Sequence, residues 1–69
     1  MLGKALIKLA LVTELDEAGF GTIQAHGDMV YGHTRDEKLA RSMTNKGWEV
    51  LPDLHPDPNV WSVGKTIAN

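Results

Sequence analysis

The expected fold depends on the stretch Gly32-His-Thr-Arg-Asp-Glu-Lys-Leu-Ala-Arg-Ser-Met-Thr-Asn-Lys-Gly47. Thr34 and Glu37 have the spacing of a capping box, in which each side chain accepts a hydrogen bond from the backbone N–H of the other residue. Gly47 tolerates the left-handed conformation in which many helices end. The stretch therefore predicts a helix over residues 35–46, with both its start and its end marked by residue type.

This predicted helix has two different faces. Leu39, Ala40 and Met43 lie on one side, because residues three and four apart are neighbours on a helix surface. A narrow apolar face of this kind suits a helix that lies across one face of a sheet. The opposite side collects the basic residues Arg35, Lys38 and Arg41.

Residues 4–15 fit two templates. On a strand, one face holds only apolar residues and a threonine, and the reverse face holds both lysines. On a helix, a cluster forms around Leu6 and Leu9, but Leu11 and Leu15 point the opposite way, toward the lysines. We predict a strand, with a helix as the alternative because Ala, Leu and Lys are good helix formers.

The rest of the chain indicates further strands. Residues 16–19 end in glycine and read as a turn, residues 20–26 and 29–33 as strands, and Gly27-Asp28 as a tight hairpin turn. Residues 48–51 and 59–67 read as two more strands, separated by a loop with three prolines. The prediction is one α+β domain over residues 1–69, with a mostly antiparallel sheet in the order β-β-β-α-β-β and one helix packed across one face.

Two segments carry a family resemblance. Asp16-Glu-Ala-Gly-Phe20 in the turn and Gly32-His-Thr-Arg-Asp-Glu37 at the helix start resemble the HicB type of antitoxin domain, which uses an acidic-Gly-Phe turn and a similar helix start. The chain differs where that family has Leu-Pro-Gly-Cys, because it carries Gly27-Asp-Met-Val30 there. The resemblance implies that the protein neutralises a partner protein by binding it.

Composition excludes several classes of protein. The chain of 69 residues has no cysteine, so it forms neither a disulfide nor a thiolate metal site. A formal net charge of −2 is too small to indicate either a nucleic-acid mimic or a polyanion binder. Lys8 interrupts the apolar stretch near the N-terminus, and that stretch is too short to span a bilayer. We therefore expect a cytoplasmic protein without a membrane segment.

No motif for catalysis stands out. His26, His33 and His55 do not match a metal signature, and no serine occupies a nucleophile turn. Gly64-Lys65-Thr66 has the end of a phosphate-binding motif but lacks its earlier glycine and a following helix. We therefore expect no catalytic residue, metal or cofactor, and a protein that is not an enzyme.

The leading hypothesis is a small regulatory or inhibitor-like protein that docks on a protein partner or on a second copy of itself. We expect Trp48, Trp61 and Tyr31 to contact the partner, since aromatic residues dominate interface energetics when they fill pockets. The alternative is a nucleic-acid-binding protein. In that case the basic side chains of the predicted helix would contact phosphates, and the aromatic side chains would stack on bases. The contacts to phosphates would come from Arg35, Lys38 and Arg41.

Overall fold

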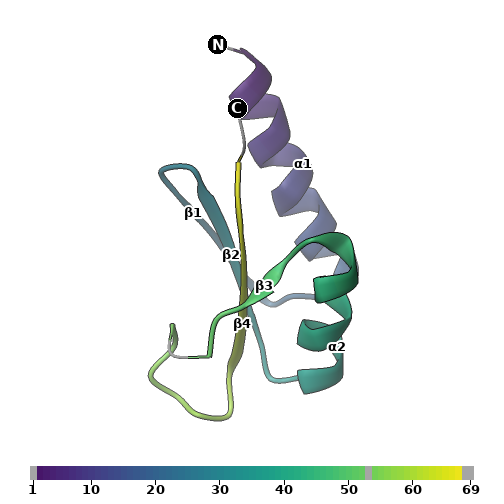
Figure 1. Ribbon diagram of the computed structural model, residues 1–69, viewed down its shortest axis with the longest axis vertical. Coiled ribbons are helices and arrows are strands. Elements are labelled where there is room, and N and C mark those ends of the chain that lie inside the picture. Colours follow the sequence, from purple (N-terminus) through teal and green to yellow (C-terminus); the bar gives the residue numbers. More distant parts are fainter. Residues whose placement is uncertain (1, 53, 68–69) are drawn as a thin grey trace.

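A computed structural model describes residues 2–52 and 54–67 of the chain. The elements are α1 (Leu2–Ala18), β1 (Thr22–His26), β2 (Met29–Thr34), α2 (Glu37–Ser42), the 3-10 helix η1 (Met43–Lys46), β3 (Glu49–Val50) and β4 (Trp61–Thr66). The α+β class is confirmed, but the order is α-β-β-α-β-β. Figure 1 shows α1 reaching beyond the sheet at the end of the molecule where both termini lie.

The predicted first strand is wrong, because residues 2–18 form a helix. Leu11, Leu15 and Ala18 follow one another at spacings of four and three, and this stripe packs on the sheet with Val12 beside it. Leu6 and Leu9 project elsewhere on the helix and remain exposed. A helix with apolar residues on two opposite sides imitates the alternation of a strand, which is why the strand template fitted the sequence.

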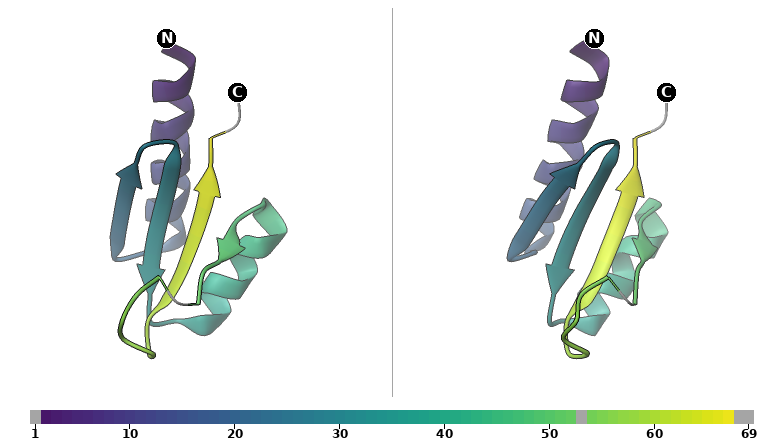
Figure 2. Two further views of the ribbon diagram at one scale, coloured as in Figure 1. Left: turned by 60° about the vertical axis from the view of Figure 1, so that its left-hand side comes forward. Right: turned by 90° about the vertical axis from the view of Figure 1, so that its left-hand side faces the viewer.

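The four strands form one antiparallel sheet in the order β1-β2-β4-β3. The hairpin turn at Gly27-Asp28 lies where it was predicted, and Gly27 has a φ of 60°. Both helices lie on the same face of the sheet, α1 over β1 and β2 and α2 over β2 and β4 (Figure 2). The prediction of a single helix on this face is therefore corrected to two. No helix of residues 2–52 and 54–67 lies on the opposite face, called the open face below, which the segment after β3 covers in part.

The start of α2 also differs from the prediction. Asp36 is the N-cap, and its carboxylate accepts a hydrogen bond from the backbone N–H of Leu39 at 3.2 Å. The Thr34 hydroxyl instead accepts from the backbone N–H of Asp36 at 3.1 Å. The helix tightens into η1 and ends at Gly47, whose φ of 89° is left-handed as expected. Asp36 takes over the cap because Thr34 is the last residue of β2.

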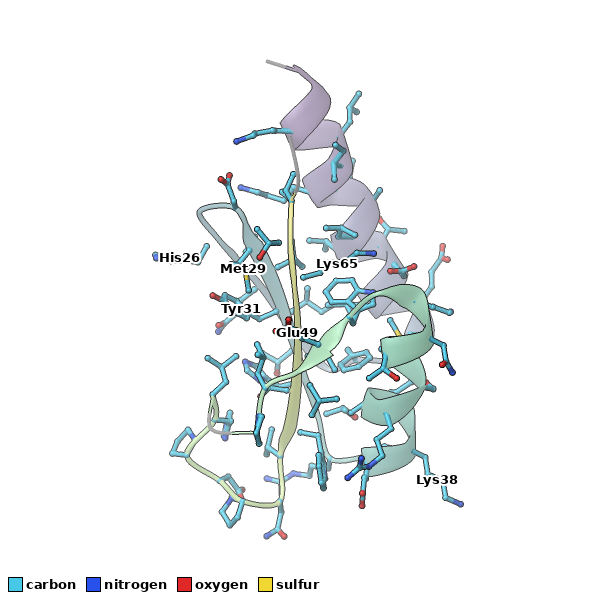
Figure 3. All side chains as sticks on the ribbon, in the orientation of Figure 1. His26, Met29, Tyr31, Lys38, Glu49 and Lys65 are labelled. Atoms are coloured by element: carbon cyan, nitrogen blue, oxygen red, sulfur yellow. The ribbon has the colours of Figure 1, made fainter. Side chains whose placement is uncertain are left out.

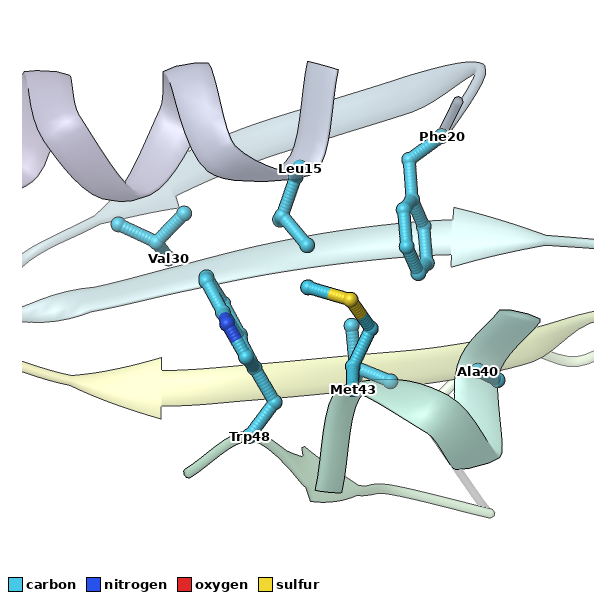
Figure 4. Close-up of a cluster of buried hydrophobic side chains, with 7 residues drawn as sticks. Leu15, Phe20, Val30, Ala40, Met43 and Trp48 are labelled. Carbon is cyan, nitrogen blue, oxygen red and sulfur yellow. The ribbon is translucent and has the colours of Figure 1, made fainter. Parts of the chain in front are cut away.

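The core lies between the helices and the sheet (Figure 4). Gly32 lets the layers approach closely, because a Cβ added there would stand 2.8 Å from Leu15 Cδ1. The aromatic rings of Phe20 and Trp48 fill the space between α1, α2 and the strands. Seven residues form the buried cluster, namely Leu15, Phe20, Val30, Ala40, Met43, Trp48 and Val63.

Candidate interaction surface

The outer face of α1 is the most apolar exposed part of the described chain. The side chains of Leu6 and Leu9 are 65% and 62% exposed, and they are neighbours on the helix surface because they lie three residues apart. Single exposed leucines are ordinary on a protein surface, but several on adjacent turns of one helix form a patch. We call the surface of Leu6, Leu9, Ala10 and Thr13 the outer face of α1.

In the first turns of α1, the charged and apolar side chains are arranged in reverse of the usual pattern for a surface helix, in which apolar residues face the core and charged residues face water. Lys4 and Lys8 lie on the same stripe as Leu11 and Leu15, and both lysines are half-buried. The ammonium group of Lys4 lies 3.4 Å from a carboxylate oxygen of Asp28 at the tip of the hairpin. The charged side chains of these turns therefore face the sheet, and the leucines face away from it.

A shallow groove of about 630 Å³ runs along the outer face of α1. Side chains of leucine and alanine line the part of the groove toward the N-terminus of α1, and charged side chains line the other end, where α1 approaches η1. Among those charged groups, the Glu14 carboxylate accepts a hydrogen bond from the indole N–H of Trp48, whereas Glu17 forms no ion pair within residues 2–52 and 54–67. The groove is lined by Leu6, Leu9, Ala10, Thr13, Glu14, Glu17, Ala18 and Lys46.

The ends of α1 carry charges that its own dipole does not favour. The first turn contains no acidic residue, and the last turn contains no basic residue. A helix N-terminus is stabilised by negative charge and a C-terminus by positive charge. Glu14, Asp16 and Glu17 instead gather near the C-terminal end, where a cation from another molecule would improve the electrostatics.

The three aromatic residues expected at an interface lie in separate places. Trp48 is only 2% exposed and belongs to the core. Trp61 is half-buried on the helix side of the sheet, and the guanidinium of Arg41 lies 5.3 Å from its ring. Tyr31 is half-buried on the open face of the sheet. The structure therefore does not bring the three residues together.

Two of the three predicted basic residues are matched by carboxylates. Arg41 Nε lies 2.7 Å from Oε2 of Glu37, one turn earlier in α2. Arg35 Nη2 lies 3.4 Å from Oδ2 of Asp57. The backbone N–H of Asn59 and the nearby Arg35 guanidinium hold the pKa of Asp57 below its usual value. Lys38 is exposed and points away from the body of the molecule (Figure 3).

The histidines divide into a contacting pair and an isolated residue. His33 Nδ1 lies 2.7 Å from the Ser62 hydroxyl, and the rings of His33 and His55 meet edge to face at 5.3 Å between centroids. Burial lowers the pKa of His33, and the neighbouring His55 lowers it further. His26 points outward from the end of β1 (Figure 3). No metal-binding group of three ligating side chains occurs in the part of the chain that the structure describes.

The open face of the sheet forms a second groove, with a volume of about 750 Å³. The proline-containing loop contributes Leu54 and His55 to its wall, and β1 and β2 provide Gln24, Tyr31 and His33. These groups offer hydrogen bonds and one aromatic ring but no cluster of like charge. The groove does not define a particular reaction or ligand.

Comparison with protein-family models, with curated proteins and with solved structures gave no match. The resemblance to HicB domains also loses its first element, because the strand with which it begins is part of α1. No helix within residues 2–52 and 54–67 is long and apolar enough to cross a membrane.

Sequence reasoning missed the outer face of α1 as a candidate site. Its signal was present in the spacing of Leu6, Leu9 and Thr13, which is three and four residues. That spacing acquires meaning only when residues 4–15 are read as a helix.

Proposed function

We propose that this protein acts by binding and docks on a partner protein through the outer face of α1. The polarity of the first turns of α1 is the observation that supports the proposal most directly. Leu6 and Leu9 face away from the protein's own core, while Lys4 and Lys8 face toward it. Exposure of apolar side chains in this pattern costs free energy in water, and a docked partner recovers that free energy.

The groove indicates the chemistry of the partner. Most of its lining residues recur at intervals of three and four along α1, which suits an amphipathic partner helix that packs its own apolar side chains against them at the same intervals. The carboxylate of Glu17 and the acidic end of α1 favour a basic residue at the corresponding end of the partner helix. The proposed occupant is thus an amphipathic helix with a basic flank.

Nucleic-acid binding through α2 has weaker support. The cations of Arg35 and Arg41 are each close to a carboxylate, so binding a phosphate would require those ion pairs to be rearranged. Lys38 alone contributes little, because the affinity for phosphates depends on several cations acting together.

A site-specific photo-crosslinker would test the proposed docking. One variant carries a photoreactive phenylalanine derivative at position 6 on the outer face of α1, and a matched variant carries it at position 38 on α2. In cells that produce the protein, we expect the first variant alone to be crosslinked to a partner. The captured partner, once purified, should bind Leu6→Glu more than 10-fold more weakly than the wild type, which corresponds to about 1.4 kcal/mol.

Lys38→Glu is the control in the binding measurement, and its affinity should equal that of the wild type. Equal capture from positions 6 and 38, or equal affinities of Leu6→Glu and wild type, would disprove docking at this face. Capture of nothing but a second copy of the chain at position 6 would also reject a separate partner protein.

A further inference from the structure

Strand β1 is an edge strand that lacks the features that usually prevent an edge from pairing with another chain. It lies at the end of the sheet order β1-β2-β4-β3, and its sequence Thr22-Ile-Gln-Ala-His26 contains no proline, lysine or carboxylate. Its pairing with β2 is one residue to one residue, so no bulge twists the edge away. Edge strands that lack all these features are templates for pairing with another chain. The opposite edge, β3, has only two residues and is followed by Pro52.

The register of the hairpin identifies the groups that are free to pair. His26 and Met29 flank the two-residue turn, and such a flanking pair is hydrogen-bonded across the ladder. Because hydrogen-bonded and non-hydrogen-bonded pairs alternate, Gln24 and Thr22 also turn their backbone groups toward β2. The N–H and C=O groups of Ile23 and Ala25 therefore point outward, toward the position of a further strand.

We propose that a second copy of this chain pairs with β1 in antiparallel register, with Gln24 opposite Gln24 on the two-fold axis. In this register Ile23 lies opposite Ala25 of the second copy, so that a large side chain meets a small one on the helix side of the sheet. Thr22 lies opposite His26 of the second copy on the open side. The strand is thus complementary to itself on both faces, as a two-fold interface requires.

The positions of the helices agree with this pairing. α1 lies over β1 and β2, and strands are about 4.8 Å apart, which places α1 about 5 Å from the axis. The two α1 helices would then run antiparallel about 10 Å apart, which is a normal packing distance for helices. Edge pairing and helix packing can therefore occur together.

The side of α1 that faces the β1 edge has suitable residues. Glu14 marks the side toward η1, because it accepts the hydrogen bond of Trp48. Successive residues turn by about 100° along a helix, so Ala5, Val12 and Asp16 lie on the opposite side, with Leu9 next to them. With the axis at Gln24, the C-terminal halves of the two antiparallel α1 helices would lie side by side, with Val12 of each on the facing side.

The proposed second copy occupies the β1 edge, whereas the partner helix proposed above occupies the groove beside Leu6, so each inference can fail without the other.

The dimer is tested by sedimentation and by disulfide trapping. The wild type should sediment as a dimer at micromolar concentration. Gln24→Cys should form a disulfide-linked dimer under mild oxidation, because Cα atoms of a non-hydrogen-bonded pair are about 4.5 Å apart. The chain has no other cysteine. Thr66→Cys, exposed on the same sheet face but on β4, is the matched control and should not form the disulfide at a comparable rate.

A charge exchange makes the test specific for the proposed register. Gln24→Lys and Gln24→Glu each place like charges opposite one another and should weaken the dimer at least 10-fold, while an equimolar mixture of the two should restore it. Leu6→Glu should leave the dimer intact. A monomeric wild type at 100-fold higher concentration, or dimers of both charged variants as stable as the wild type, would overturn the proposal.

Discussion

The indole Nε1 of Trp48 donates a hydrogen bond to the Glu14 carboxylate, with 2.5 Å between the heavy atoms. This bond joins the C-terminal part of α1 to the residue that follows the left-handed Gly47. Trp48 can be buried because its one polar group has a partner, and it thereby closes the core between α1 and the sheet (Figure 4).

Glu14→Ala should therefore destabilise the protein by about 1–3 kcal/mol, because the buried indole N–H would lose its partner. The free energy of unfolding in urea, followed by tryptophan fluorescence, measures the effect. Glu17→Ala, one turn further along the same helix, is the control and should change the stability by less than about 0.5 kcal/mol. Equal effects of the two substitutions would show that the hydrogen bond does not hold Trp48.

Gly32→Ala should destabilise the protein by about 1–3 kcal/mol through overpacking. The added methyl group would stand 2.8 Å from Leu15 Cδ1 and 3.0 Å from Phe20 Cδ2, both of which are buried between the layers. Thermal unfolding followed by circular dichroism would register the loss as a lower Tm. Gly21→Ala is the matched control, since no atom lies within 4 Å of its added Cβ. A Tm for Gly32→Ala at or above that of the wild type would contradict the close approach of α1.

The lowered pKa of His33 predicts that acid destabilises the protein. Burial and the neighbouring His55 oppose protonation of His33 in the folded chain, whereas the unfolded chain titrates near its ordinary pKa of about 6.5. The unfolded state therefore binds more protons between the lowered pKa and 6.5, and linkage requires stability to rise with pH over that interval. The contribution is fully present above about pH 6.5 and is lost as the pH falls.

Urea titrations between pH 5 and pH 8 would measure this dependence. His33→Gln should flatten the profile, since the glutamine does not titrate, whereas His26→Gln should keep the wild-type slope because His26 lies away from the His33–His55 contact. A His33→Gln profile as steep as that of the wild type would assign the pH dependence to other groups.

The affinity for nucleic acid should be low, and substitutions of the basic residues on and next to α2 should change it little. Because Arg35 and Arg41 are each paired with a carboxylate, we expect no micromolar affinity for DNA or RNA at 0.15 M salt. Fluorescence anisotropy with short single-stranded and duplex oligonucleotides at several salt concentrations would measure it. Micromolar binding that falls steeply with salt and is lost in both Lys38→Glu and Arg35→Glu would instead favour a nucleic-acid-binding function.

The sequence predicted those parts of the structure correctly whose conformation depends on a few adjacent residues. Gly27-Asp28 turns the chain because a tight hairpin needs a residue with positive φ, and Gly47 ends the second helix for a similar reason. The strands around residues 22–34 and 61–66 likewise follow from β-branched and aromatic residues between turns.

The structure of residues 2–18 was decided by packing. Their local pattern fits a strand and a helix, and the helix prevails because Leu11, Leu15 and Ala18 fill the space above Gly32 while the chain avoids a further edge strand. The same packing decides which leucines remain outside, and hence where the candidate interaction surface lies. Trp48 shows the converse effect, since its residue type suggested an interface, whereas its side chain is buried in the core and donates a hydrogen bond to Glu14.

The sequence by itself thus determined the hairpin turn, the second helix and the α+β class, since each depends on the conformational preferences of a few adjacent residues. The turn predicted over residues 16–19 is wrong, because residues 16–18 complete α1. Only the tertiary structure decided that the first element is a helix and which of its two apolar sides is buried against the sheet. The physical reason is that burial is a property of contacts between distant segments, and a helix with apolar residues on two sides does not indicate which side will be buried.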